Sequence, residues 1–118
     1  MTMQWHFEEH GGTGVLSLSG FLGERVVHRF HGAFAWACAR STGALVLDLT
    51  TLRGISADGE RAIAAAAATL PADRTPLAVC GLTGQPAALL TGGACPARLR
   101  LHPDLDAALA ATCSNRSA

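Results

Sequence analysis

Apolar and polar residues alternate in two short segments near the start of the chain. These segments, residues 5–8 and 15–19, flank a glycine-rich stretch at residues 10–14. Alternation with a period of two is typical of strands that bury one face, and clustered glycines supply the positive φ that tight reversals need. The pattern predicts two strands joined as a hairpin, with Gly20 ending the second strand.

Two longer segments place apolar residues at helical spacing. The first, residues 24–40, predicts a helix whose apolar stripe consists of Val26, Val27, Phe30, Phe34, Ala37 and Cys38. The second, residues 58–70, is dominated by alanine, which favours helices and permits close approach to a sheet. Its predicted inward positions are Ala62, Ile63, Ala66, Ala67 and Leu70.

Two nearly continuous apolar runs predict the centre of the sheet. Residues 44–49 and 76–81 contain few polar side chains, as expected of strands that are covered on both faces. The predicted buried centre consists of Leu45, Val46, Leu47, Leu49, Leu77 and Val79. Residues 50–56, between the first run and the second helix, are predicted to be a connecting loop.

The C-terminal part combines shorter elements. A short helix is predicted at residues 85–91 and an edge strand at residues 98–101. A last helix is predicted at residues 105–112, with Asp104 as its N-cap. Residues 114–118 are small and polar, so we expect a flexible tail there.

The predicted element order is β-β-α-β-α-β-α-β-α. Strand–helix alternation after an opening hairpin favours an α/β fold whose mixed sheet is mostly parallel in its later part. We expect four or five strands with helices packed on them. No linker or internal repeat divides the sequence, so residues 1–113 are expected to form one domain.

Composition limits the partners of this domain. Nine arginines and nine acidic side chains give a formal net charge of zero, and there is no lysine. A neutral domain has no long-range field to attract nucleic acid or an anionic membrane surface. The sequence has neither a long apolar run nor a basic start followed by an apolar stretch. We therefore expect a cytoplasmic protein without membrane insertion.

The cysteines and histidines do not form a recognisable metal motif. The sequence contains no C-x-x-C pair and no zinc spacing among Cys38, Cys80, Cys95 and Cys113. With 49% hydrophobic residues the chain can bury a core without disulfides, so we expect reduced thiols. His28 and His31 lie three residues apart but lack a third ligand. Neither a metal nor a cofactor is expected.

Candidate catalytic residues are few. The chain has no Tyr, no Lys and no acid pair at a fixed spacing, and Ser17 and Ser19 lack the G-x-S-x-G elbow of hydrolases. These features favour a binding protein over an enzyme. The alternative is a small-ligand-binding domain with a pocket near Cys95 or His102. A concave apolar pocket with converging polar groups would indicate that alternative.

Several segments resemble a known family. Residues 16–23 (LSLSGFLG) resemble a strand that runs into a G-x-L-D turn. Residues 47–59 (LDLTTLRGISADG) resemble the loop D-L-S-x-V-x-x-I-D-S-S-G-L, and residues 88–93 and 105–109 resemble two helices that follow it. The family is the STAS domain, which includes the bacterial anti-sigma-factor antagonists. The resemblance extends over most of the chain.

The resemblance implies a protein-binding role in signalling and transcription regulation. Such antagonists bind a kinase-like anti-sigma factor, which phosphorylates a serine of the loop. The implied partner-binding residues are Gly20, Phe21, Leu22, Gly23, Arg53, Ser56, Ala57, Asp58 and Gly59. STAS-like chains also serve as accessory subunits of stress-signalling assemblies and lipid-transport complexes, and that role is an alternative. The sequence decides neither the partner's identity nor whether the chain forms a homodimer.

The loop departs from the family pattern where phosphorylation is expected. Aligned without gaps, Ser56 replaces the family's Asp, and Ala57 replaces its first Ser. Asp58 replaces the second Ser, which the resemblance implies is the phosphorylated one. Gly23 replaces the acid of the turn. Ser56 is the remaining hydroxyl in the core of the loop, and it is either a relocated acceptor or a loop residue or helix cap.

Asp58 has two interpretations. Its carboxylate carries about one negative charge where the family places a phosphate of about −1.5 to −2, so it imitates the phosphate in part. It also suits the N-cap of the helix that opens with residues 58–61, because acids are preferred there. The two interpretations are compatible, since a helix N-terminus is also where a phosphate binds well.

Trp36 also has two interpretations. Helical geometry places it at the edge of the apolar stripe, beside Arg29 and Arg40. It either packs at the edge of the core with an arginine stacked on it, or it anchors an interface, where Trp and Arg are enriched.

Overall fold

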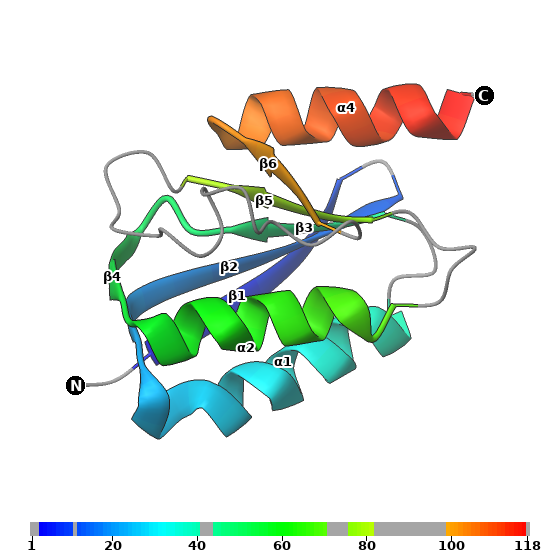
Figure 1. Ribbon diagram of the computed structural model, residues 1–118. Helices are drawn as coiled ribbons and strands as arrows, with labels where there is room; N and C mark the ends of the chain where they lie inside the picture. Colours follow the sequence, from blue (N-terminus) through cyan, green and yellow to red (C-terminus); the bar gives the residue numbers. More distant parts are fainter. Residues whose placement is uncertain (1–2, 11, 41–43, 71–75, 82–98, 118) are drawn as a thin grey trace.

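The computed structural model describes residues 3–10, 12–40, 44–70, 76–81 and 99–117 (Figure 1). The strands are β1 (Met3–His10), β2 (Thr13–Leu22), β3 (Leu45–Asp48), β4 (Leu52–Ile55), β5 (Leu77–Cys80) and β6 (Leu99–His102). The helices are the 3₁₀ helix η1 (Glu24–Val26), α1 (Val27–Arg40), α2 (Ala57–Ala68) and α4 (Leu105–Ser117). The helix predicted at residues 85–91 lies outside the described part of the chain.

The sheet is mixed, in agreement with the predicted α/β class. Its strand order is β1-β2-β3-β5-β6, and β4 pairs with β2 off this path. The β1–β2 hairpin is antiparallel, whereas the other pairings are parallel. Helices α1 and α2 lie on one face of the sheet, and α4 lies on the other (Figure 1).

The predicted core is confirmed. Strands β3 and β5 occupy interior positions of the sheet. The six predicted central residues are all buried: Leu45, Val46, Leu47, Leu49, Leu77 and Val79. On α2 the five predicted inward positions are buried as well: Ala62, Ile63, Ala66, Ala67 and Leu70. The apolar stripe of α1 packs against the same core.

Within the described residues the sheet has six strands, one more than the four or five predicted, and β4 is the unexpected one. Residues 52–55 were expected in a loop but form β4 beside the last residues of β2. The segment has only two apolar side chains, Leu52 and Ile55, with Arg53 and Gly54 between them, so it shows no strand periodicity. Both apolar side chains are buried in the main core. Pairing with β2 therefore makes the segment a strand, where its own sequence does not.

The C-terminal elements follow the prediction with one difference. Strand β6 lies at the edge of the sheet, and the Asp104 carboxylate accepts a hydrogen bond from the Ala107 N–H at 2.8 Å, which confirms the cap. Helix α4 continues to Ser117, beyond the predicted end at Thr112. No glycine or proline follows Thr112 to stop it. The flexibility of residues 114–118 stays a prediction.

Cys80 lies at the end of β5 and is fully buried. Its thiol lies 3.5 Å from the Asp48 carboxylate, which also accepts hydrogen bonds from the amide and hydroxyl of Thr50. Burial, reinforced by the negative charge of Asp48, raises the pKa of Cys80 to about 12. The thiol therefore stays protonated at neutral pH and packs as a small apolar group.

We expect Cys80 to resist alkylation in the folded protein, because the thiolate is the reactive form and is nearly absent below its raised pKa. Cys38, half-buried on α1, is the internal control and should react first. Iodoacetamide labelling at pH 8, followed by peptide mass spectrometry, measures the two rates. Equal rates at the two cysteines in the folded protein would contradict the assignment.

Candidate partner-binding site

The predicted site residues converge where β2 ends, β4 runs and α2 begins. Parallel pairing aligns Phe21 with Gly54 and Leu22 with Ile55. The Leu22 carbonyl then accepts a hydrogen bond from the Ser56 N–H at 2.9 Å. The two segments that the family resemblance singled out are thus joined directly, although some thirty residues separate them in the chain.

A local irregularity opens the site. Gly20 has a φ of +90°, and the register between β2 and β4 shifts between Gly20 and Phe21. Only glycine adopts that backbone conformation without strain. The shift leaves Arg53 of β4 as the extra residue, because Gly20 pairs with Leu52 and Phe21 with Gly54. A bulge of this kind bends the strand that carries the extra residue and redirects its side chains, so it affects how β4 presents Arg53.

The ring of Phe21 fills the space that side chains at Gly23 and Gly54 would need. A Cβ atom at Gly23 would lie 2.5 Å from the ring, and one at Gly54 would lie 2.9 Å from it. A side chain at either position would displace the ring. This explains why position 23 holds glycine here, where the family pattern has an acid.

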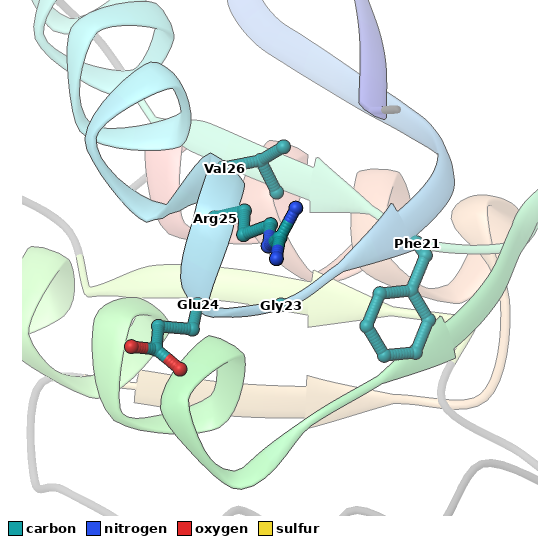
Figure 2. Close-up of a pocket in the computed structure, with 5 residues that line it drawn as sticks. All are labelled: Phe21, Gly23, Glu24, Arg25 and Val26. Carbon is teal, nitrogen blue, oxygen red and sulfur yellow. The ribbon is translucent and has the colours of Figure 1, made fainter. Parts of the chain in front are cut away.

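A pocket of about 350 Å³ opens beside this ring. Its lining consists of Phe21, Gly23, Glu24, Arg25 and Val26 (Figure 2). Phe21 and Val26 supply apolar surface, while Glu24 and Arg25 are exposed and bring one charge of each sign. The pocket therefore suits an apolar side chain with polar neighbours better than a strongly charged group.

The N-cap of α2 is Ser56, which corrects the interpretation of Asp58 as the cap. The Ser56 hydroxyl accepts a hydrogen bond from the Gly59 N–H at 3.2 Å, and its backbone is extended. Helix α2 begins at Ala57, one residue earlier than predicted. Because β4 ends at Ile55, the junction between strand and helix falls on Ser56. The prediction that Ser56 is a cap is confirmed.

Asp58 is the second residue of α2 and lies on the surface. Its carboxylate pairs with the Arg61 guanidinium at 2.7 Å, and the two side chains are 48% and 66% exposed. A pair this exposed stabilises the fold by no more than about 1 kcal/mol. A carboxylate in the first turn is also favoured by the helix dipole. Asp58 therefore presents a fixed negative charge to any partner at this surface.

The exposed part of the site is smaller than the predicted set. Arg53, Ala57 and Asp58 are exposed. The remaining predicted residues are buried or half-buried and shape the surface from below: Gly20, Phe21, Leu22, Gly23, Ser56 and Gly59. Arg53 lies on β4 and the other two exposed residues lie on the first turn of α2, so a partner meets both elements at once.

Two charged residues around this surface, Glu24 and Arg61, were not among the predicted site residues. Glu24, Asp58 and Arg61 line a groove of about 360 Å³ between α1 and α2, together with His31. The spacing of Asp58 and Arg61 was a usable signal, because side chains three apart on a helix interact. Glu24 offered no local signal, since only the packing of α1 against α2 brings it there.

One candidate from the sequence, Trp36, lies elsewhere. Trp36 is 41% exposed on α1, and the Arg40 guanidinium stacks 4.6 Å from its ring centre. That contact matches the first interpretation, and the interface role stays a prediction. Across the described residues, no group of three or more His, Cys, Asp or Glu side chains is placed to hold a metal ion. None of the helices searched is long and apolar enough to cross a membrane.

Comparison with known proteins identifies the family. The family model described as Mlab, STAS domain, matches residues 5–92. The chain is a member of the STAS domain family. Among curated proteins, none matches the sequence. The STAS resemblance inferred from the motifs is therefore confirmed.

Solved STAS-like structures have the same fold. An anti-sigma factor antagonist from Mycobacterium paratuberculosis is 28% identical, with a TM-score of 0.77 and 94% of each chain covered. The antagonist SpoIIAA in its unphosphorylated form is 14% identical, with a TM-score of 0.67, and covers 98% of this chain and 100% of its own. A Shewanella loihica protein with a SpoIIAA-like fold is 16% identical, with a TM-score of 0.59, and covers 94% and 93%.

We expect the capping role to separate Ser56 from Asp58 in thermal and urea unfolding. Ser56→Ala should lower the free energy of unfolding by ~0.5–2 kcal/mol, because the Gly59 N–H loses its acceptor. Ser56→Asp should retain most of the stabilisation that the cap provides, since Asp caps a helix about as well as Ser. Asp58→Ala should cost less than Ser56→Ala. The reverse order would show that Asp58 carries the cap.

Two glycines on helices make a matched pair for the close approach of α2 to β2. A Cβ at Gly59 would lie 2.4 Å from the Leu22 carbonyl oxygen, whereas one at Gly32 on α1 meets nothing within 4 Å. Gly59→Ala should destabilise the fold by ~1–3 kcal/mol through overpacking. Gly32→Ala should stabilise it by about 0.5–1 kcal/mol. Equal melting temperatures would contradict the tight contact.

Proposed function

We propose that this STAS domain is a protein-binding regulatory module of the anti-sigma-factor-antagonist type, and not an enzyme. The observation that carries the proposal is the exposed carboxylate of Asp58, at the position that the family resemblance aligns with the phosphorylated serine. The binding surface comprises Arg53, Ala57 and Asp58 with the neighbouring β2–α1 turn. The similarity to an anti-sigma factor antagonist from Mycobacterium paratuberculosis, at 28% identity, supports this class.

We infer that Asp58 leaves the family's phosphorylation switch locked, lost or replaced by another input. A phosphate would add about −1.5 to −2 charges and three acceptor oxygens, whereas Asp58 supplies about −1 and shares it with Arg61. A kinase finds no hydroxyl at position 58, and a phosphatase finds nothing to remove. The domain is therefore held in one state at this surface, and its regulation comes from another input.

Ser56 does not replace the missing acceptor. Its hydroxyl already accepts the Gly59 N–H, and the side chain is half-buried between β4 and α2. Phosphorylation there would place a dianion in the half-buried junction between β4 and α2, and burying a charge is costly unless it is fully paired. We therefore infer that the Ser56 hydroxyl caps α2 and is not a relocated phosphoacceptor.

The partner is a protein with a mixed-charge surface, such as a kinase-like anti-sigma factor. The exposed side chains of the site include Arg25, Arg53 and Arg61 of one sign and Glu24 and Asp58 of the other. A surface on which both signs are interspersed selects by local complementarity more than by long-range attraction. The apolar pocket at Phe21 and Val26 offers a place for an anchoring side chain.

An accessory-subunit role in a stress-signalling or lipid-transport complex is the alternative for the same surface. The domain would then bind a subunit of that complex in place of an anti-sigma factor. Capture of the partner on immobilised protein distinguishes the two roles by what is bound. We place the protein in the cytoplasm in either case, as its sequence predicts.

A gain-of-function experiment tests the phosphorylation argument. Purified protein incubated with an anti-sigma kinase and ATP should take up no phosphate, because position 58 has no hydroxyl. Asp58→Ser restores a hydroxyl in the family's register and should be phosphorylated there. Ala57→Ser is the matched control, with a hydroxyl one residue away, and should stay unmodified. Mass spectrometry locates the phosphate, and stoichiometric phosphate on Ser56 of the unaltered protein would contradict the proposal.

Two charge-reversal variants test the binding surface. Arg53→Glu should weaken affinity for the captured partner by about tenfold, which corresponds to about 1.4 kcal/mol. Arg100→Glu makes the same charge change on β6, at the far edge of the sheet, and should leave affinity unchanged. Isothermal titration measures both. Equal effects at the two arginines would place the binding surface elsewhere.

A further inference from the structure

Strand β1 is an open edge of the sheet. Within the described residues it pairs with β2 alone, in an unbroken antiparallel register from Met3 to His10. Its eight residues contain no proline and no lysine. Natural proteins protect exposed edges with short strands, bulges, prolines or charged side chains, and of these β1 has the charged side chains of Glu8 and Glu9. An edge of this kind is a template for another strand.

The hydrogen bonds of β2 show which groups of β1 face outward. The Gly14 N–H donates to the Ala44 carbonyl at 3.0 Å, and the Leu18 carbonyl accepts from the Thr51 hydroxyl at 2.9 Å. Both groups of β2 therefore point away from β1. In an antiparallel ladder the opposite residues then form non-hydrogen-bonded pairs, and their own N–H and C=O groups point to the far side.

The opposite residues are Glu9 and Trp5, and alternation adds Phe7 between them. These three residues direct their peptide groups toward the open edge. At the start of the strand the Arg29 guanidinium already donates to the Met3 carbonyl at 3.4 Å. The open stretch thus begins at Trp5 and ends near Glu9, with Phe7 at its midpoint.

We propose that a second copy of this chain pairs with this edge, β1 against β1, antiparallel about a two-fold axis at Phe7. The axis places Phe7 opposite Phe7 of the second copy and Trp5 opposite Glu9, so all the outward groups of the open stretch find partners. These pairs are the hydrogen-bonded ones. His6 then faces Glu8 of the second copy in a non-hydrogen-bonded pair, where side chains approach most closely.

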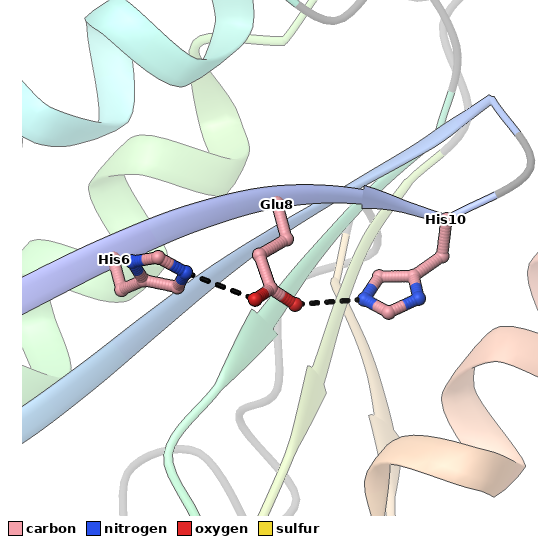
Figure 3. Close-up of polar contacts among 3 residues, drawn as sticks. All are labelled: His6, Glu8 and His10. Carbon is pink, nitrogen blue, oxygen red and sulfur yellow. Dashed lines mark hydrogen bonds and ion pairs between the residues drawn. The ribbon is translucent and has the colours of Figure 1, made fainter.

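One face of this pairing is complementary in its hydrogen-bonding side chains. Glu8 accepts hydrogen bonds from His6 at 3.0 Å and from His10 at 3.1 Å, all on the exposed face of β1 (Figure 3). These hydrogen bonds lower the pKa of Glu8, so it is a carboxylate at neutral pH. In the pair of copies each carboxylate meets the His6 ring of the other chain. The arrangement occurs twice by symmetry, which is what an isologous interface requires.

The other face is aromatic. The rings of Trp5 and Phe7 each lie 5.3 Å from the Trp36 ring, and Arg40 stacks on Trp36. Trp5 and Trp36 are 39% and 41% exposed, which is unusual for side chains of this size. The two-fold axis brings two such clusters side by side, and aromatic and Arg side chains are enriched at interfaces. Self-pairing therefore covers apolar surface that the single chain leaves in water.

The first experiment measures self-association by sedimentation equilibrium of the full chain. The unaltered protein should show a concentration-dependent monomer–dimer equilibrium. His6→Glu places carboxylates opposite each other twice and should raise the dissociation constant roughly two- to thirty-fold. His28→Glu makes the same substitution on exposed helix α1 and should leave it unchanged. Circular dichroism confirms that both variants fold.

The second experiment tests the register with disulfides. Opposed residues in non-hydrogen-bonded pairs have Cα atoms about 4.5 Å apart, which a disulfide spans. A mixture of His6→Cys and Glu8→Cys proteins should form a heterodimeric disulfide under mild oxidation. Neither variant alone should do so beyond the level of the unaltered protein, which accounts for native cysteines.

Either of two results would overturn the proposal. A monomer at every concentration would mean that the edge binds another strand or none, and a dimer without the 6–8 disulfide would use a different surface. Neither result bears on the proposed function, because partner binding is measured at Arg53 and Asp58. A failure of that binding would in turn leave the edge proposal standing.

Discussion

The main-chain contact between β2 and the start of α2 is the constraint on which the candidate site depends. The Leu22 carbonyl accepts the Ser56 N–H, and Gly59 packs so closely against the same oxygen that a methyl group has no room. Together they fix where β4 ends and at what angle the helix leaves. The exposed positions of Arg53 and Asp58 follow from that junction. A change at Leu22 or Gly59 would thus move the surface without touching its charged residues.

Much of the fold could be predicted because its strongest signals are local. The run at residues 44–49 is apolar except for Asp48, and α1 and α2 repeat their buried positions at helical spacing, so each element can be predicted from its own sequence. Strand β4 could not be predicted, since Leu52 and Ile55 flank polar or small residues and gain strand structure only from pairing with β2. Strand β4 can be identified only from its pairing with β2 in the folded chain.

The candidate site was predicted in its membership and not in its roles. Family resemblance supplied the residues, and the structure does bring the turn and the loop together. The cap was assigned to Asp58 because Asp and Ser suit the position equally well by sequence. Ser56 is the cap because β4 ends at Ile55 and α2 begins at Ala57. The pairing of β4 with β2 fixes that junction. Likewise the ring of Phe21 over Gly23 depends on packing that no local pattern encodes.

The Phe21 ring affects how readily the two departures from the family pattern, Gly23 and Asp58, could be reversed by substitution. Position 58 is on the surface, and one substitution there restores a hydroxyl with nothing in its way. Position 23 is different, because any side chain there would displace the Phe21 ring, which also lies against Gly54. An acid at position 23 would therefore require the Phe21 ring to move or to be replaced by a smaller side chain. Position 58 can change alone, whereas position 23 can change only together with Phe21.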